Sequence, residues 1–188
     1  MSPKVKEFLV TILFGTIVCA IVGVIIYGIT IFKMNDMRFV ILLYGFYGSV
    51  FFGMLNYLKL REQIAVIVFV IFLTILIRGK TTHPILYLRD VYLLLPLFLS
   101  IYLYKIFINK YSTVPIFLRG LSLVLIYPIF YITALMLLIL ILGVNFISAL
   151  SSLIISFRIS IIVAFGLAIG FDLYEKYKIK INSFVKVV

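Results

Sequence analysis

The sequence predicts an all-α protein, a polytopic bundle of membrane-spanning helices. The chain has 188 residues, of which 65% are hydrophobic and only 12% are charged. Its apolar runs are longer than a soluble domain of this size can bury, and the segments between them are short. We therefore expect one helical bundle over residues 1–172 and no separate soluble domain.

Six apolar runs are candidates for membrane spans, because crossing the hydrocarbon core takes about 20 residues. They cover residues 8–32, 39–58, 64–77, 91–108, 116–142 and 146–171. The first run leads into further spans and is interpreted as a retained helix rather than a signal peptide. The third run is short, between Gln63 and Arg78. We expect six spans, and four or five if the third run does not cross.

The charge pattern predicts the topology. The chain has seventeen basic and six acidic residues. Most of the basic residues lie at the ends of apolar runs, where we expect them to contact lipid headgroups rather than nucleic acid. With six spans, one side collects Lys4, Lys6, Lys59, Arg61, Lys105, Lys110, Arg119, Lys176, Lys178, Lys180 and Lys186. The positive-inside rule then places both termini in the cytoplasm. We expect the chain in the plasma membrane of a bacterial or archaeal cell.

Small residues recur at every fourth position in three of the spans. They are Gly15, Cys19 and Gly23 in the first span, Gly45, Ser49 and Gly53 in the second, and Ser148, Ser152, Ser156, Ser160, Ala164 and Ala168 in the last. Such stripes allow helices to approach closely in lipid. Two interpretations stay open for each stripe: packing within one bundle, or an interface between copies in a homo-oligomer.

Arg158 is the most informative single residue, because it lies near the middle of the last apolar run, where a charge is costly. It lies roughly opposite the small-residue stripe of that span. Asp90 is the nearest candidate partner, and Tyr127 and Tyr131 flank Pro128 in the fifth span. The alternatives are a structural ion pair, a water-lined cavity or pore, and a bound lipid phosphate or anionic substrate.

The residue inventory disfavours catalysis. Catalytic sites need a positioned acid and base, an activated nucleophile or metal ligands. The chain has one histidine, His83, one cysteine, Cys19, and acidic residues near the ends of the spans. We therefore expect no enzymatic activity, no cofactor and no metal.

The segment 173–188 is interpreted as a basic cytoplasmic tail. After Asp172, charged and apolar residues alternate with a period of two, which is typical of a strand. Lys178, Ile179, Lys180 and Ile181 are the candidate docking residues, adding a strand to a sheet of a cytosolic protein. A tail lying unfolded near anionic headgroups is the alternative.

Two resemblances extend this interpretation. In size and span number the chain resembles the substrate-binding subunits of energy-coupling-factor vitamin transporters, whose first helix meets a membrane partner through small residues; Gly15, Cys19 and Gly23 match these positions, with glycine and cysteine in place of alanine. The chain is also similar in size and class to the membrane subunit of the Kiwa anti-phage system, which works with a cytosolic partner.

The leading hypothesis is accordingly a non-enzymatic, oligomeric membrane subunit that anchors or senses together with a cytosolic protein. The Kiwa resemblance implies a role in defence. The alternative is a channel or a substrate-binding transport subunit with a cavity lined by Arg158.

Overall fold

A computed structural model describes residues 3–28, 37–78, 90–110, 116–143 and 146–185. Within these ranges, the side chains of residues 3, 78, 109–110, 116–119, 146–149, 152 and 178–185 lie outside the description. The described part is helical and contains α1 (Pro3–Tyr27), α2 (Met37–Tyr57), α3 (Leu60–Arg78), α5 (Leu94–Lys110), α6 (Ile116–Ile141) and α7 (Phe146–Val185). Six described helical segments are long and apolar enough to cross a membrane.

The third apolar run, which was the shortest candidate, belongs to this set. Leu60–Ile77 forms a continuous helix of 18 residues with the composition of a span. Its first turn begins upstream of the apolar run, at Leu60 rather than Ile64. The predicted class, an all-helical chain with six helices of membrane-spanning length, is thus confirmed.

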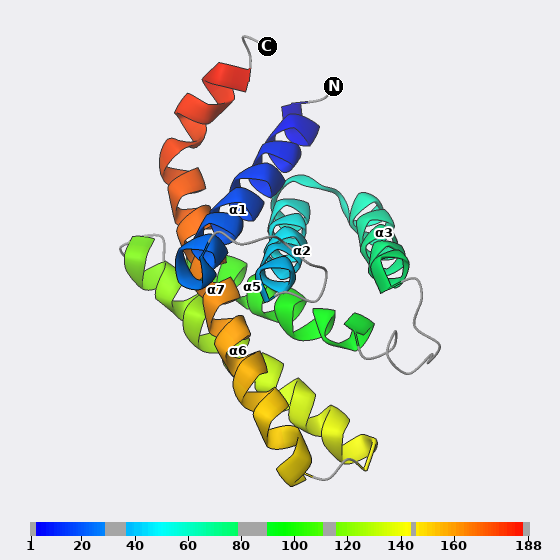
Figure 1. The fold of residues 1–188 in the computed structure, drawn as a ribbon. Helices are drawn as coiled ribbons and strands as arrows, with labels where there is room; N and C mark the ends of the chain where they lie inside the picture. Colours follow the sequence, from blue (N-terminus) through cyan, green and yellow to red (C-terminus); the bar gives the residue numbers. More distant parts are fainter. Residues whose placement is uncertain (1–2, 29–36, 79–89, 111–115, 144–145, 186–188) are drawn as a thin grey trace.

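The centre of the bundle is a close contact of α1, α2 and α7, which lie side by side in Figure 1. A Cβ added at Gly45 of α2 would collide with the Cβ of Cys19 in α1, and one added at Gly166 of α7 would lie 3.1 Å from the Cα of Cys19. The backbones of α1 and α7 also meet where Gly170 faces Gly15. Small residues at these positions therefore bring three helices within backbone contact.

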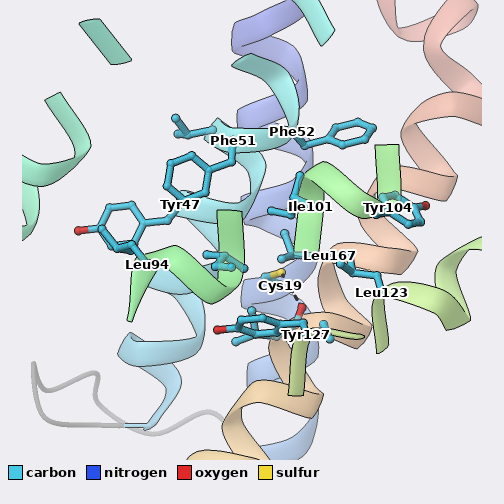
Figure 2. Close-up of a cluster of buried hydrophobic side chains, with 14 of the residues drawn as sticks. Cys19, Tyr47, Phe51, Phe52, Leu94, Ile101, Tyr104, Leu123, Tyr127 and Leu167 are labelled. Carbon is cyan, nitrogen blue, oxygen red and sulfur yellow. Dashed lines mark hydrogen bonds between the residues drawn. The ribbon is translucent and has the colours of Figure 1, made fainter. Parts of the chain in front are cut away.

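α5 and α6 complete the bundle around larger side chains. In Figure 2, Cys19 lies among Ile101 of α5, Leu123 and Tyr127 of α6 and Leu167 of α7, all of them buried. Aromatic rings fill the layer nearer the end of α2, where Phe52 stacks on Phe171 of α7 at 3.9 Å between ring centroids. The core thus changes from small residues between α1, α2 and α7 to bulky residues where α5 and α6 pack on them.

Side chains from other elements satisfy the carbonyl groups that helix ends leave unpaired. α1 finishes at Gly28, whose φ of +76° suits glycine, and the buried Arg38 of α2 donates to the Gly28 carbonyl at 3.0 Å. At the end of α2, Lys105 of α5 donates from Nζ to the Leu55 carbonyl. A cation also stabilises the negative end of a helix dipole, so both residues tie neighbouring elements together.

α7 differs from the predicted tail. The helix continues without a break to Val185, so the strand-like alternation expected for residues 173–188 is wrong as far as the structure describes them. No proline or glycine follows Gly170 before the end of the chain, and extending an existing helix costs far less than starting one. The helix that begins in the core therefore continues through these residues, although their alternating sequence is typical of a strand.

The described ends of the chain lie at the same end of the bundle (Figure 1). We name it the inner end, after the side that the charge pattern predicts to be cytoplasmic; it carries the start of α1, the end of α2 at Tyr57 and Lys105 of α5. The outer end carries Tyr27 of α1 and Arg38 of α2.

Candidate functional site

Four tyrosines, three of them buried and Tyr44 half-buried, form a cluster inside the bundle. Tyr44 and Tyr47 come from α2, and Tyr127 and Tyr131 come from α6, one helical turn apart in each case. The rings of Tyr44 and Tyr131 meet edge to face at 6.1 Å, and those of Tyr127 and Tyr131 at 5.7 Å. We call these four residues the tyrosine cluster.

A further element reaches the tyrosine cluster. The hydroxyl of Thr74, near the end of α3, forms a 3.0 Å hydrogen bond with the hydroxyl of Tyr47. The contacts of the cluster therefore connect α2, α3 and α6. Asp90 lies in the helical turn that leads into α5.

Two of the chain's five prolines, Pro96 and Pro128, lie within the predicted spans, and they act differently. Pro128 lies within α6, between Tyr127 and Tyr131, and the helix runs through it although the Val124 carbonyl loses its usual backbone donor. Pro96 lies in the first turn of α5, where a missing N–H is tolerated. The fourth span is therefore interrupted ahead of Pro96, at Leu93, rather than kinked in its middle.

A second polar layer closes the inner end. The Tyr104 hydroxyl of α5 donates to Oδ1 of Asp172 in α7 at 3.2 Å, and the hydroxyls of Tyr57 and Tyr174 lie 3.1 Å apart. Gly120 of α6 leaves room for the Asp172 carboxylate, because a Cβ there would lie 2.9 Å from Oδ2. These contacts fix α7 to α2, α5 and α6 at the level where it leaves the bundle.

Arg158 lies away from both polar layers. Its side chain is exposed, and it forms no hydrogen bond or ion pair with the residues that the structure describes. Gly166 of α7 contacts Cys19 of α1. Eight residues from this contact toward the outer end, about 12 Å along each helix axis, α7 is at Arg158 and α1 is at its last residue, Tyr27. Arg158 is thus level with the outer end of α1, whereas α7 itself begins twelve residues further out, at Phe146.

The structure does not bring Arg158 together with Asp90, Tyr127 and Tyr131. Tyr127 and Tyr131 belong to the tyrosine cluster, where they are buried at 1% and 8% exposure, and Asp90 lies in the turn that leads into α5. A shallow groove of about 180 Å³ between α5 and α6 is lined by Tyr92, Pro96, Phe130, Thr133 and Leu137 among others. Arg158 is not part of its lining.

The small-residue stripes of α1 and α2 face each other. Antiparallel helices place Gly15 against Ser49, Cys19 against Gly45 and Gly23 against Ile41, and Gly53 receives the ring of Phe8. The stripe of α7 is turned toward α6 at Ala168, which meets Gly120, and its Ser160 and Ala164 are buried. Ser156 is half-buried, while the side chains of Ser148 and Ser152 lie outside the description. These contacts belong to packing within the chain.

The candidate docking residues Lys178, Ile179, Lys180 and Ile181 fall on the helical backbone of α7, and their side chains lie outside the description. Among the described residues, no group of histidine, cysteine, aspartate or glutamate is arranged to hold a metal ion.

Sequence reasoning missed Tyr44, Tyr47, Thr74 and Arg38, and it placed Lys105 on the inner side without predicting its contact with α2. Each is ordinary by type: tyrosines and threonines are common in spans, and basic residues near span ends suit headgroups. The three-residue spacing of Tyr44 and Tyr47, which places both on one face of a helix, was the available signal for the first pair. No local sequence pattern predicts that Thr74 contacts Tyr47, or that Lys105 contacts Leu55.

The comparisons with known proteins give no relative: no family model, no curated protein and no solved structure matches this chain.

Proposed function

We propose that the chain is a non-enzymatic membrane subunit that anchors or senses, working with a cytosolic protein bound at its basic inner end. The observation that carries the proposal is the length of α7. The helix has 40 residues, about 60 Å, which is roughly twice the thickness of the hydrocarbon core, about 30 Å. We infer that its lysine-containing turns, which run to Val185, form a helical extension beyond the membrane.

The extension is attached firmly to the bundle. Asp172 and Tyr174 hold α7 to α5 and α2, and Glu175, Lys176 and Tyr177 directly after them are exposed. The sequence adds Lys178 and Lys180 within the next turn. Because a continuous helix links this basic segment to the core, a protein bound there is coupled mechanically to the bundle. This property supports anchoring and sensing.

The observations favour this function over transport. The alternative required a cavity at Arg158, but Arg158 is exposed at the level of the outer end of α1. The resemblance to vitamin-transporter subunits implied that Gly15, Cys19 and Gly23 meet a membrane partner, but α2 and α7 cover them. Because the described stripes are used inside the chain, they no longer support a homo-oligomer either.

The test is to purify the chain from its native membranes into nanodiscs and weigh the complexes by native mass spectrometry. We expect a stoichiometric soluble protein with the full chain and none with a chain truncated after Lys176. The double variant Lys178→Glu with Lys180→Glu should lose the partner while keeping the full length. Lys80→Glu, a charge reversal on the predicted outer side, is the matched control and should retain it.

Two results would contradict the proposal. One is the absence of any stoichiometric protein on the full chain, with anionic lipid alone retained. The other is equal partner retention by the full chain, the truncated chain and the double variant.

A further inference from the structure

α3 is the helix with the thinnest packing in the described part of the chain. It packs almost entirely on α2, and large apolar side chains around its circumference are exposed, among them Ile64, Val68, Phe69 and Phe72. Figure 1 shows it standing apart from α5, α6 and α7. In lipid no hydrophobic force presses such a helix onto its neighbour, so it is held by its few direct contacts.

The inner end of α3 is fixed. Only Leu58 and Lys59 separate it from α2, and Glu62 caps the helix by accepting from the Lys59 N–H at 2.8 Å. Gln63 donates to the carbonyls of Leu58 and Met54 at 2.9 Å and 3.3 Å. This end has the properties of a pivot, because the link is short and Glu62 and Gln63 form hydrogen bonds with its backbone groups.

Toward the outer end, one polar contact stands out. Thr74 is buried at 6% exposure, and its hydroxyl bonds both the Tyr47 hydroxyl at 3.0 Å and the Val70 carbonyl of its own helix at 2.7 Å. Tyr47 is itself 1% exposed. Moving α3 away from α2 breaks the first bond and leaves the second intact, so Tyr47 alone loses its partner.

The Tyr47 hydroxyl belongs to the tyrosine cluster. The rings of Tyr47 and Tyr44 meet at 6.4 Å, and Tyr44 in turn contacts Tyr131 beside Pro128. α6 lacks one backbone hydrogen bond at Pro128 and is therefore easier to bend there. The position of α3 is thus connected through three rings to the weakest point of α6.

We propose that α3 is a hinged helix that swings from α2 about the Leu58–Lys59 link, with the Thr74–Tyr47 hydrogen bond as its latch. Closed, α3 satisfies Tyr47 and holds the tyrosine cluster in its observed arrangement. Open, it leaves the Tyr47 hydroxyl to rearrange within the cluster against α6. This device goes beyond partner binding, and it operates in the chain without any cytosolic protein.

The test uses distance measurement by double electron–electron resonance on the full chain in nanodiscs. Spin labels are placed at Leu76→Cys in α3 and Leu95→Cys in α5, both exposed, in a Cys19→Ala background. We expect a main distance and a longer minor one. Thr74→Val, which keeps the side-chain shape, should raise the ratio of the longer to the main distance about 3- to 15-fold, the range of one transmembrane hydrogen bond.

Tyr47→Phe should give the same increase, and Thr74→Ser should restore the wild-type ratio because it keeps the hydroxyl. Thr133→Val is the matched control: Thr133 is exposed and bonds the Ile129 carbonyl of its own helix, so its loss should leave the ratio unchanged. A single distance in every variant, or equal ratios in Thr74→Val and Thr133→Val, would overturn the proposal.

Discussion

At the scale of single residues, glycines are what allow the helices of this bundle to approach closely. Gly15, Gly45, Gly166 and Gly170 have no Cβ, and this lets α1, α2 and α7 approach around Cys19. Dispersion contacts depend steeply on distance, so each such position gains many weak contacts at once. In lipid these contacts replace the hydrophobic force that packs soluble cores.

Gly45→Val is therefore expected to destabilise the bundle by roughly 1–3 kcal/mol or more, because overpacking forces the neighbours apart. The new Cβ would collide with the Cβ of Cys19, which cannot rotate away. Thermal unfolding in detergent measures the effect. Ala65→Val enlarges a side chain at an exposed position of α3 and should leave the midpoint nearly unchanged. Equal midpoints for both variants would show that the α1–α2 contact is looser than described.

At the scale of elements, α7 shows how a tertiary contact overrides a local pattern. The alternation after Asp172 indicates a strand, yet Asp172 and Tyr174 are bonded to α5 and α2 as part of a helix. Lysine is a good helix former and isoleucine a tolerable one, so the following turns continue the helix at small cost. The lysine-rich turns then extend from the inner end, where the proposed partner binds.

The helical tail makes a spectroscopic prediction. Carbonyl and Cα chemical shifts of residues 174–184 should show helix in nanodiscs, and Ile179→Pro should remove helical shifts around Ile179, because proline clashes with the preceding turn and lacks a donor. Shifts upstream of Asp172 should not change. Extended-type shifts over these residues in the unmodified chain would favour the alternation over the helix.

At the scale of the whole molecule, the arrangement is a bundle whose two described ends lie together (Figure 1). The six crossings that the sequence predicts would have this consequence, and the helix of Leu60–Ile77 is the element on which that even number depends. The prediction that both termini are cytoplasmic, which rests on the charge pattern, depends on it as well.

Reporter fusions test this topology directly. Green fluorescent protein should fluoresce, and alkaline phosphatase should be inactive, when fused at either the N- or the C-terminus. Phosphatase inserted after Leu142, in the turn between α6 and α7, should be active. If the two termini gave opposite results, α3 would not cross the membrane and the topology of the spans on one side of it would invert.

The sequence by itself determined the class of the protein, the number of helices of membrane-spanning length among the described residues, and the small-residue positions where α1 and α2 approach closely. These follow from composition, run length and four-residue spacing, which depend only on the chain and its solvent. It did not determine where α7 ends, nor that Gly166 and Gly170 bring α7 against α1. The tertiary structure decided which helices meet at Gly15, Cys19 and Gly45, that Arg158 faces outward near the end of α1, and that Thr74 meets Tyr47. Such pairings depend on the rotation and level of each helix against its neighbours, which no local pattern encodes, because lipid accepts an apolar helix in any rotation until another helix packs against it.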